Sequence, residues 1–219
     1  MVSFNSQIFT QGIIKYNNEF IVSSGHYNSS YITKIDLTTG EIFQRKKLEK
    51  KYFGEGIVFN NKYIIQLTWR EKTALCRNPA TFDIIDTFDY DGEGWGICFD
   101  NKHLLISDGS NIIKKLNNET YHCIEKIPII YRQRKIVGLN DLEYYNNYIY
   151  ANIWNMNYIL KIDYKSGIVE SVYDFRNLVS FLKKKNKNIG VLNGVSAISK
   201  NLFLITGKNW PNTFIVELI

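Results

Sequence analysis

The 219-residue sequence predicts an all-β fold, a β-propeller in which five blades of four antiparallel strands surround a central channel. The prediction rests on three observations. A sequence repeat of short apolar strands and turns occurs five times, and its copies are spaced by forty residues or more. In addition, 15% of all residues are aromatic, a composition that favours strands. A β-sandwich also contains many short strands, but the regular period favours the propeller. We expect a single domain over residues 1–219.

Each repeat opens with a first strand whose start carries a recurring glycine or its equivalent. The openers lie at Gly12, Gly56, Gly96, Leu142 and Gly194, so the steps between them are 44, 40, 46 and 52 residues. Periods in the forties with about four strands each are typical of β-propellers.

The second strand of each repeat is an apolar segment that follows an asparagine-containing turn. These segments read "EFIVSSG" (19–25), "KYIIQLTW" (62–69), "HLLISDG" (103–109), "YIYANIW" (148–154) and "LFLITGK" (202–208). Third and fourth strands follow in the first four repeats, whereas the fifth ends at Ile219 without a fourth strand. We expect residues 2–5 to supply that strand, closing the ring and removing an open sheet edge. The long last step predicts an inserted short helix or loop at 175–187.

Composition argues against several classes of function. The net charge is +6, but the basic residues are scattered apart from short runs such as 132–135, which we interpret as solvated loops, and we expect no nucleic-acid partner. No apolar run approaches the roughly 18 residues that span a bilayer, so we expect no membrane insertion. The start "MVSFNSQIFTQG" lacks the pattern of a signal peptide.

The cysteines and histidines form no recognisable site. Cys76, Cys98 and Cys123 are odd in number and lack a CxxC spacing, so we interpret them as buried free thiols. The three histidines show no metal-ligand pattern. We therefore expect neither a metal nor a cofactor.

Unusual residues recur where first strands start and second strands end. Because neighbouring strands in a blade are antiparallel, both places lie on the same face, at one mouth of the channel. The residues there are Gln11, Glu55, Trp95, Asn140, Asp141 and Asn193 at the starts, Ser24, Trp69, Asp108, Trp154 and Lys208 at the ends, and Phe9 and Phe53 two residues before Gln11 and Glu55.

Singly, each of these residues has a structural interpretation. The tryptophans would pack between blades, Glu55 would lie in a solvated turn, Lys208 would be a surface charge and Asp108 would start a turn. Their recurrence at equivalent positions instead favours a pocket with aromatic walls and a few polar groups, the usual form of a ligand site.

These segments resemble the glutaminyl-peptide cyclotransferases (glutamine cyclotransferases) of the plant and bacterial type, a family of five-bladed propellers. The resemblance covers nearly the whole chain in family order. It is carried by "FTQG" (9–12), "YFGEG" (52–56), "LTW" (67–69), "GEGWG" (92–96), "SDGS" (107–110), "LNDLEY" (139–144), "YANIW" (150–154), "LNGV" (192–195) and "TGKNWP" (206–211).

The resemblance implies an enzyme that converts the N-terminal glutamine of peptides or proteins to pyroglutamate and releases ammonia, without a metal or cofactor. It also suggests a secreted or periplasmic location, and we expect a monomer. The family's pocket residues correspond to Glu55, Lys208 and Asn140 as catalytic groups, and to Phe9, Gln11, Phe53, Trp69, Trp95 and Trp154 as substrate-binding groups.

The sequence departs from the family pattern at three places. Val22 stands where the family often has glutamate, and Asp141 stands where a longer glutamate is usual. Both changes bear on the shape of the pocket. The segment before "FTQG" is short, which bears on the closure of the ring.

The implied reaction needs little from the enzyme, because the attacking α-amine is tethered to the γ-carboxamide that it attacks. One carboxylate can take the proton from the amine and pass it to the departing ammonia, and we expect Glu55 to do so. Burial should raise the pKa of Glu55, and Lys208 should oppose that rise. Negative charge develops on the oxygen of the substrate's amide during the reaction. We expect hydrogen-bond donors to the substrate from Lys208, Asn140, Gln11 and the tryptophan indole N–H groups.

Two alternatives stay open at this point. A propeller that binds peptides or sugars at the same mouth without catalysis would carry the same pocket. A lactonase-like propeller hydrolase would need a central metal held by several carboxylates and amides, whereas this mouth offers mainly tryptophans.

Overall fold

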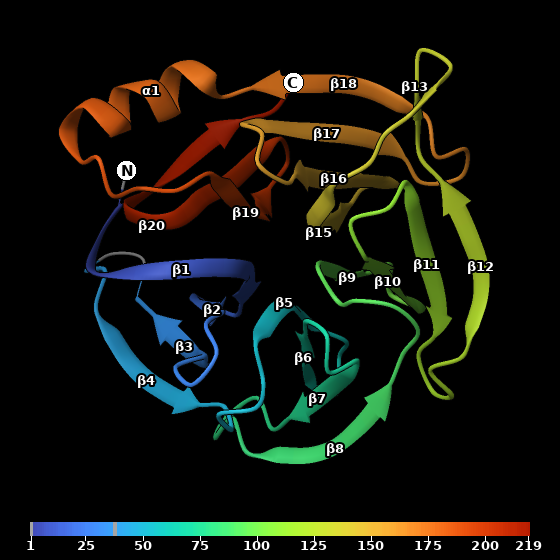
Figure 1. Ribbon diagram of the computed structural model, residues 1–219, viewed down its shortest axis with the longest axis horizontal. Helices are drawn as coiled ribbons and strands as arrows, with labels where there is room; N and C mark the ends of the chain where they lie inside the picture. Colours follow the sequence, from blue (N-terminus) through green and yellow to red (C-terminus); the bar gives the residue numbers. More distant parts are fainter. Residues whose placement is uncertain (1, 37–38) are drawn as a thin grey trace.

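The computed structural model describes residues 2–36 and 39–219 as a ring of β-sheets around a central axis (Figure 1). Four sheets of four or more strands surround the axis in this part of the chain. Three of them have four strands each. These are β5 (Gly54–Phe59), β6 (Ile64–Thr68), β7 (Thr73–Arg77), β8 (Ile84–Asp89); β9 (Ile97–Phe99), β10 (His103–Ser107), β11 (Ile112–Asn117), β12 (Cys123–Pro128); and β15 (Leu139–Tyr145), β16 (Tyr148–Ile153), β17 (Tyr158–Asp163), β18 (Val169–Asp174).

The fourth sheet has six strands in the order β19-β20-β1-β2-β3-β4. Its strands are β1 (Val2–Tyr16), β2 (Glu19–Ser24), β3 (Tyr31–Ile35), β4 (Ile42–Lys47), β19 (Leu192–Ser199) and β20 (Leu202–Glu217). A separate hairpin pairs β13 (Ile130–Tyr131) with β14 (Arg134–Lys135), where we had predicted only a solvated loop.

The all-β propeller is confirmed, but the prediction of five separate four-stranded blades is wrong. The structure has four sheets around the ring because β1 and β20 are long enough to belong to two repeats at once. Residues 10–16 of β1 pair with β2, while Ile8 and Phe9 pair with Trp210 and Lys208 of β20. This second pairing joins the first and the last sequence repeat into one sheet.

The start of the chain hydrogen-bonds to its last strand, as the missing fourth strand of the last repeat had suggested. Val2 is paired with Thr213 and Ser3 with Asn212, both antiparallel. The first and the last strand of the chain therefore pair within one sheet, which joins the first repeat to the last (Figure 1).

Glycines at the starts of the first strands allow these strands to approach closely around the axis. A Cβ atom added at Gly56 would lie 2.6 Å from the carbonyl oxygen of Trp95, and one added at Gly96 would lie 2.0 Å from that of Asn140. Only glycine fits such contacts. The close packing of the first strands at the centre of the ring thus explains why glycine recurs where these strands begin.

The hydrophobic core lies between neighbouring sheets. One cluster joins Val58 and Ile65 of the second repeat to Ile97 and Leu104 of the third. Each sheet thus buries an apolar face against the next, as expected for radially arranged blades.

The cysteines only partly follow the prediction: Cys76 and Cys98 are buried, but Cys123 is exposed. It begins β12, an outermost strand with most of its side chains in solvent.

The predicted insertion contains helix α1 (Arg176–Lys185), which lies against the last repeat (Figure 1). Val179 and Leu182 are buried in a cluster with Leu192 and Trp210. Three lysines in its last turn are favourably placed against the helix dipole. No helix in the described ranges is long and apolar enough to cross a membrane.

Candidate active site

A cavity of about 180 Å³ opens at one end of the ring. Its walls come from the starts of first strands and the ends of second strands, so the expectation that these places share one mouth is confirmed. The cavity is lined by all nine predicted site residues: Phe9, Gln11, Phe53, Glu55, Trp69, Trp95, Asn140, Trp154 and Lys208. Their chemical roles remain predictions.

Glu55 lies inside the protein rather than in a solvated turn. It is 5% exposed and stands in β5 between two glycines that let neighbouring backbone approach. The side-chain amide of Gln11 donates a 2.8 Å hydrogen bond to its Oε1 atom. Asn193 in turn donates to Oε1 of Gln11 at 3.3 Å and to the carbonyl oxygen of Thr10 at 3.1 Å. A chain of buried amides therefore fixes the orientation of the carboxyl group.

Burial raises the pKa of Glu55 well above its usual range. The Lys208 ammonium and the Gln11 hydrogen bond act in the opposite direction, while Glu93 and Asp141 add to the rise. Burial also lowers the pKa of Lys208, and the charge of Glu55 opposes that shift. The two groups thus compete for protons in one small cavity, which suits proton transfer near neutral pH.

Aromatic rings form most of the remaining wall. The ring centres of Phe53 and Trp69 lie 5.5 Å apart, those of Trp95 and Trp154 lie 5.8 Å apart, and Lys208 Nζ is 4.8 Å from the centre of the Phe9 ring. These contacts come from different repeats. The wall can therefore enclose the apolar stem of a side chain while one face stays open to a peptide chain.

Sequence reasoning missed two residues behind this wall. The ring of His26 lies 4.2 Å from that of Phe9, and the ring of Tyr27 lies 5.3 Å from that of Phe53. Burial, with the nearby Lys208 ammonium, lowers the pKa of His26. Their position directly after the second-strand segment "VSSG" was the available signal.

Glu93 is a third missed residue, and it corrects one prediction. Its Oε2 atom accepts hydrogen bonds from Nε1 of Trp69 at 2.7 Å and from Nε1 of Trp95 at 3.0 Å. We expected these two indole N–H groups to donate to the substrate. They donate to Glu93 instead. Glu93 stands in the motif "GEGWG", two residues before Trp95, which would have been the signal for it.

Asn140 lines the cavity, but the oxygen of its side-chain amide is almost completely covered. Its side chain is buried, and its Oδ1 atom has no hydrogen-bond partner among the residues that the structure describes. The backbone is fixed from behind, because Ser107 Oγ donates to the Asn140 carbonyl oxygen at 2.8 Å. A buried acceptor without a partner is costly unless a ligand or water satisfies it, so this atom suits a substrate N–H group.

The other residues at strand starts and ends lie outside the cavity lining. Ser24 is buried, Asp108 forms an ion pair of 2.8 Å with Lys114, and Asp141 accepts from the backbone N–H of Val195 at 3.1 Å. The two departures from the family pattern do not line the cavity either. Val22 is fully buried among the apolar side chains of the first and last repeats, and Asp141 is bound to backbone.

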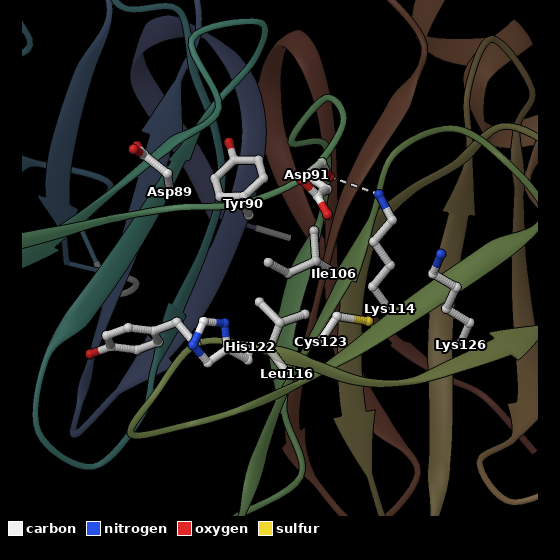
Figure 2. Close-up of a pocket in the computed structure, with 10 residues that line it drawn as sticks. Asp89, Tyr90, Asp91, Ile106, Lys114, Leu116, His122, Cys123 and Lys126 are labelled. Atoms are coloured by element: carbon white, nitrogen blue, oxygen red, sulfur yellow. Dashed lines mark hydrogen bonds between the residues drawn. The ribbon is translucent and has the colours of Figure 1, made fainter.

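Two further hollows contain none of the predicted site residues. A groove of about 290 Å³ lies between the segment after β8 and strands β10–β12, and Figure 2 shows Cys123 in it with Lys114 and Lys126. The second, of about 340 Å³, lies where the first strands end and includes Glu143, whose pKa burial raises to about 8. Within 2–36 and 39–219, no three His, Cys, Asp or Glu side chains are grouped to hold a metal ion.

Comparison with known proteins identifies the family of the chain. Residues 1–218 match the family described as glutamine cyclotransferase. The chain is 31% identical over 214 residues to a glutaminyl-peptide cyclotransferase of Arabidopsis thaliana, covering 96% of this chain and 67% of that protein. The crystal structure of Myxococcus xanthus glutaminyl cyclase superposes with a TM-score of 0.90 at 28% identity, covering 98% of this chain and 92% of the other. With a family match along nearly its full length, the chain belongs to the glutamine cyclotransferase family.

Proposed function

We propose that this protein is a glutaminyl-peptide cyclotransferase, which converts the N-terminal glutamine of a peptide to pyroglutamate and releases ammonia. The observation that carries the proposal is the enclosed carboxyl group of Glu55, oriented by Gln11 and surrounded by aromatic rings. The family match and the names of both relatives support the same activity. The cavity of about 180 Å³ is smaller than the roughly 300–1,000 Å³ sites of drug-sized ligands, and it suits a single residue at a chain end.

In the reaction, the α-amine nitrogen attacks the carbonyl carbon of the γ-carboxamide, and the bond from that carbon to the amide nitrogen then breaks. Glu55 in its carboxylate form takes the proton that leaves the attacking nitrogen. The resulting carboxylic acid gives it to the departing nitrogen, which leaves as ammonia. Because burial raises its pKa, the Glu55 carboxylate is a stronger base than that of a solvent-exposed glutamate.

Asn140, Lys208 and Gln11 have separate tasks in this mechanism. Oδ1 of Asn140, which has no partner among the described residues, accepts from an N–H group of the substrate. Lys208 stabilises the negative charge that develops on the carboxamide oxygen. Gln11 orients Glu55 through one N–H of its Nε2 atom, and the second N–H of that atom can donate to the substrate.

The aromatic rings give the substrate its orientation. Phe53 and Trp69 on one side and Trp95 and Trp154 on the other enclose the glutamine side chain and exclude water from the reacting atoms. Trp154 is 54% exposed and stands at the opening, where the rest of the peptide would leave the pocket.

Release of ammonia from a glutamine-initiated dipeptide tests the proposal, with the N-acetylated dipeptide as control because it lacks the nucleophilic amine. We expect ammonia and a product lighter by the mass of one ammonia, from the free dipeptide only, with and without a chelator. Binding of the dipeptide without ammonia would instead support a non-catalytic binding protein. Loss of turnover on chelation would support a metal-dependent enzyme.

We further propose that the six-stranded sheet represents two of five repeats joined edge to edge, and that the chain acts as one domain and as a monomer. The order β19-β20-β1-β2-β3-β4 supports the first point, since it contains the first strands of two repeats. A pocket formed by one chain supports the second. Sedimentation of the pure protein at the mass of one chain, 25.6 kDa, is the expected result.

A further inference from the structure

The carboxylate of Glu93 contacts two walls of the pocket at the same time. Its Oε2 atom accepts from Nε1 of Trp69, which follows β6, and from Nε1 of Trp95, which precedes β9. The two distances, 2.7 and 3.0 Å, are those of charge-assisted hydrogen bonds. Its other oxygen faces Nε of Arg70 at 3.4 Å. One side chain thus connects tryptophans that belong to neighbouring sheets.

The segment that carries Glu93 is firmly attached to the end of β6. The N–H of Gly94 donates to the carbonyl oxygen of Trp69 at 2.9 Å. The Tyr90 hydroxyl donates to the carbonyl oxygen of Thr68 and accepts from its N–H. These bonds hold the backbone on both sides of Glu93, so the position of the carboxylate is set before any ligand binds.

We propose that Glu93 is a positioning residue of the active site, whose carboxylate fixes the indole rings of Trp69 and Trp95 for the substrate and whose negative charge acts on Glu55. The inference rests on the proposed function, because the indoles are taken to enclose the substrate glutamine. It adds a residue that does not line the cavity and does not touch the reacting atoms.

Glu93 carries its charge at neutral pH. Although partial burial acts in the opposite direction, the N–H groups of Trp95 and Trp69 together with Arg70 hold the pKa of Glu93 below its usual range. An anionic acceptor binds an indole N–H more strongly than a neutral one does. Both indole N–H groups thereby have an acceptor within the protein and need none from the substrate.

The charge of Glu93 also reaches Glu55. The groups that act electrostatically on Glu55 are Lys208 from β20, Glu93 from the segment before β9 and Asp141 from β15, and Tyr27 and Tyr90 respond to its charge in turn. Of these, the Glu93 carboxylate favours the protonated form of Glu55 and the Lys208 ammonium opposes it. Loss of the Glu93 charge should therefore make Glu55 more acidic.

Two substitutions separate the two effects. Glu93→Ala removes both the acceptor and the charge, whereas Glu93→Gln keeps an acceptor oxygen and removes the charge. The matched control is Asp91→Asn, which makes the same change of charge two residues away. Asp91 is exposed, and Lys114 donates to its backbone carbonyl oxygen rather than to its carboxylate.

The first measurement is the nitrogen–proton spectrum of the four tryptophan indoles, which requires no turnover. In Glu93→Ala we expect the signals of Trp69 and Trp95 to move and that of Trp210 to stay, while Trp154, whose ring lies 5.8 Å from that of Trp95, should follow Trp95 to a smaller extent. Trp210 is the internal reference for an intact fold, because its ring is buried and its N–H donates to the carbonyl oxygen of Gly190 at 3.0 Å rather than to Glu93. Glu93→Gln should shift the first two signals less, and Asp91→Asn should shift none of the four.

The second measurement is the pH profile of ammonia release. Glu93→Ala should raise KM about tenfold, the order expected for losing a charge-assisted hydrogen bond. Glu93→Gln should keep KM near the wild-type value and move the acidic limb of kcat/KM to lower pH. Asp91→Asn should match the wild type in both.

The inference is overturned if Glu93→Ala leaves the Trp69 and Trp95 signals in place, or if it moves them while KM and the acidic limb stay unchanged. A wild-type protein that binds the dipeptide but releases no ammonia would contradict the proposed activity alone. In that case the indole signals and the dipeptide Kd, which Glu93→Ala should raise by the same factor as KM, still decide whether Glu93 positions the rings.

Discussion

The side-chain amide of Gln11 donates a hydrogen bond of 2.8 Å to Oε1 of Glu55, although the two residues are 44 positions apart in the chain. They occupy equivalent places in consecutive repeats, on β1 and β5. The relationship shows how a repeated backbone can generate an asymmetric site, since the same position carries the orienting amide in one repeat and the carboxyl group in the next.

The substitution Glu55→Gln should reduce turnover by roughly 10²-fold or more, because the amide keeps the shape of the side chain but cannot accept the proton. The fold should remain intact, since a neutral amide avoids the cost of burying a charge and can still accept from Gln11. Initial rates of ammonia release, with the melting temperature as control, provide the measurement. A variant that keeps near-normal rates would show that the proton is transferred by another group.

The substitution Lys208→Met should shift the acidic limb of the kcat/KM profile to higher pH. The Lys208 ammonium lowers the pKa of Glu55, so its loss raises that pKa and the reactive carboxylate forms only at higher pH. If Lys208 also stabilises the oxyanion, kcat should fall by about 10²–10³-fold. This shift is opposite in sign to that expected for Glu93→Gln, and limbs that move in the same direction in both variants would contradict the electrostatic assignment.

Replacing the three cysteines should affect stability without affecting chemistry. Cys76 and Cys98 are buried, and burial raises the pKa of Cys76 to about 11, so neither is a ready nucleophile. The variant Cys76→Ala/Cys98→Ala/Cys123→Ser should lose about 1 kcal/mol for each buried position and melt at lower temperature. Turnover per folded molecule should match the wild type. A well-folded variant without activity would instead indicate a covalent mechanism.

The substitution Glu143→Gln should stabilise the protein more at high pH than at low pH. Burial raises the pKa of Glu143 from 4.5 to about 8, so between these values the folded state holds a proton that the unfolded chain releases. The stability that this group contributes is fully present below pH 4.5 and is lost as the pH rises through about 8. A glutamine side chain does not titrate, so the stability of the variant lacks this contribution to its pH dependence.

Melting temperatures of wild type and variant at pH 4.5 and pH 8.5 test this prediction, since the two conditions lie at the ends of that range. We expect the difference between the two proteins to grow by roughly a few degrees in favour of the variant at the higher pH. A difference that stays constant would mean that the Glu143 carboxyl titrates alike in the folded and the unfolded chain.

The sequence alone determined the class of fold and the mouth of the channel at which the pocket lies, whereas strand position by itself also pointed to Ser24, Asp108 and Asp141, which do not line the cavity. The fold class and the mouth both depend on patterns that are local within each repeat: a glycine where first strands crowd the axis, an asparagine turn, and an apolar second strand with an unusual residue at its end. Antiparallel pairing then brings strand starts and strand ends to one face, so Glu55, Trp69, Trp95, Trp154 and Lys208 could be assigned to one mouth without coordinates.

Only the tertiary structure decided how the repeats are joined and how each polar group is satisfied. The β1–β20 pairing merges two repeats into one sheet because two strands bend across a repeat boundary, which no local pattern records. Glu93 binds the indoles of Trp69 and Trp95, and Cys123 lies exposed on an outermost strand, because of neighbours contributed by distant parts of the chain. Hydrogen bonding and burial depend on three-dimensional neighbours, whereas strand periodicity depends on the nearest residues in sequence.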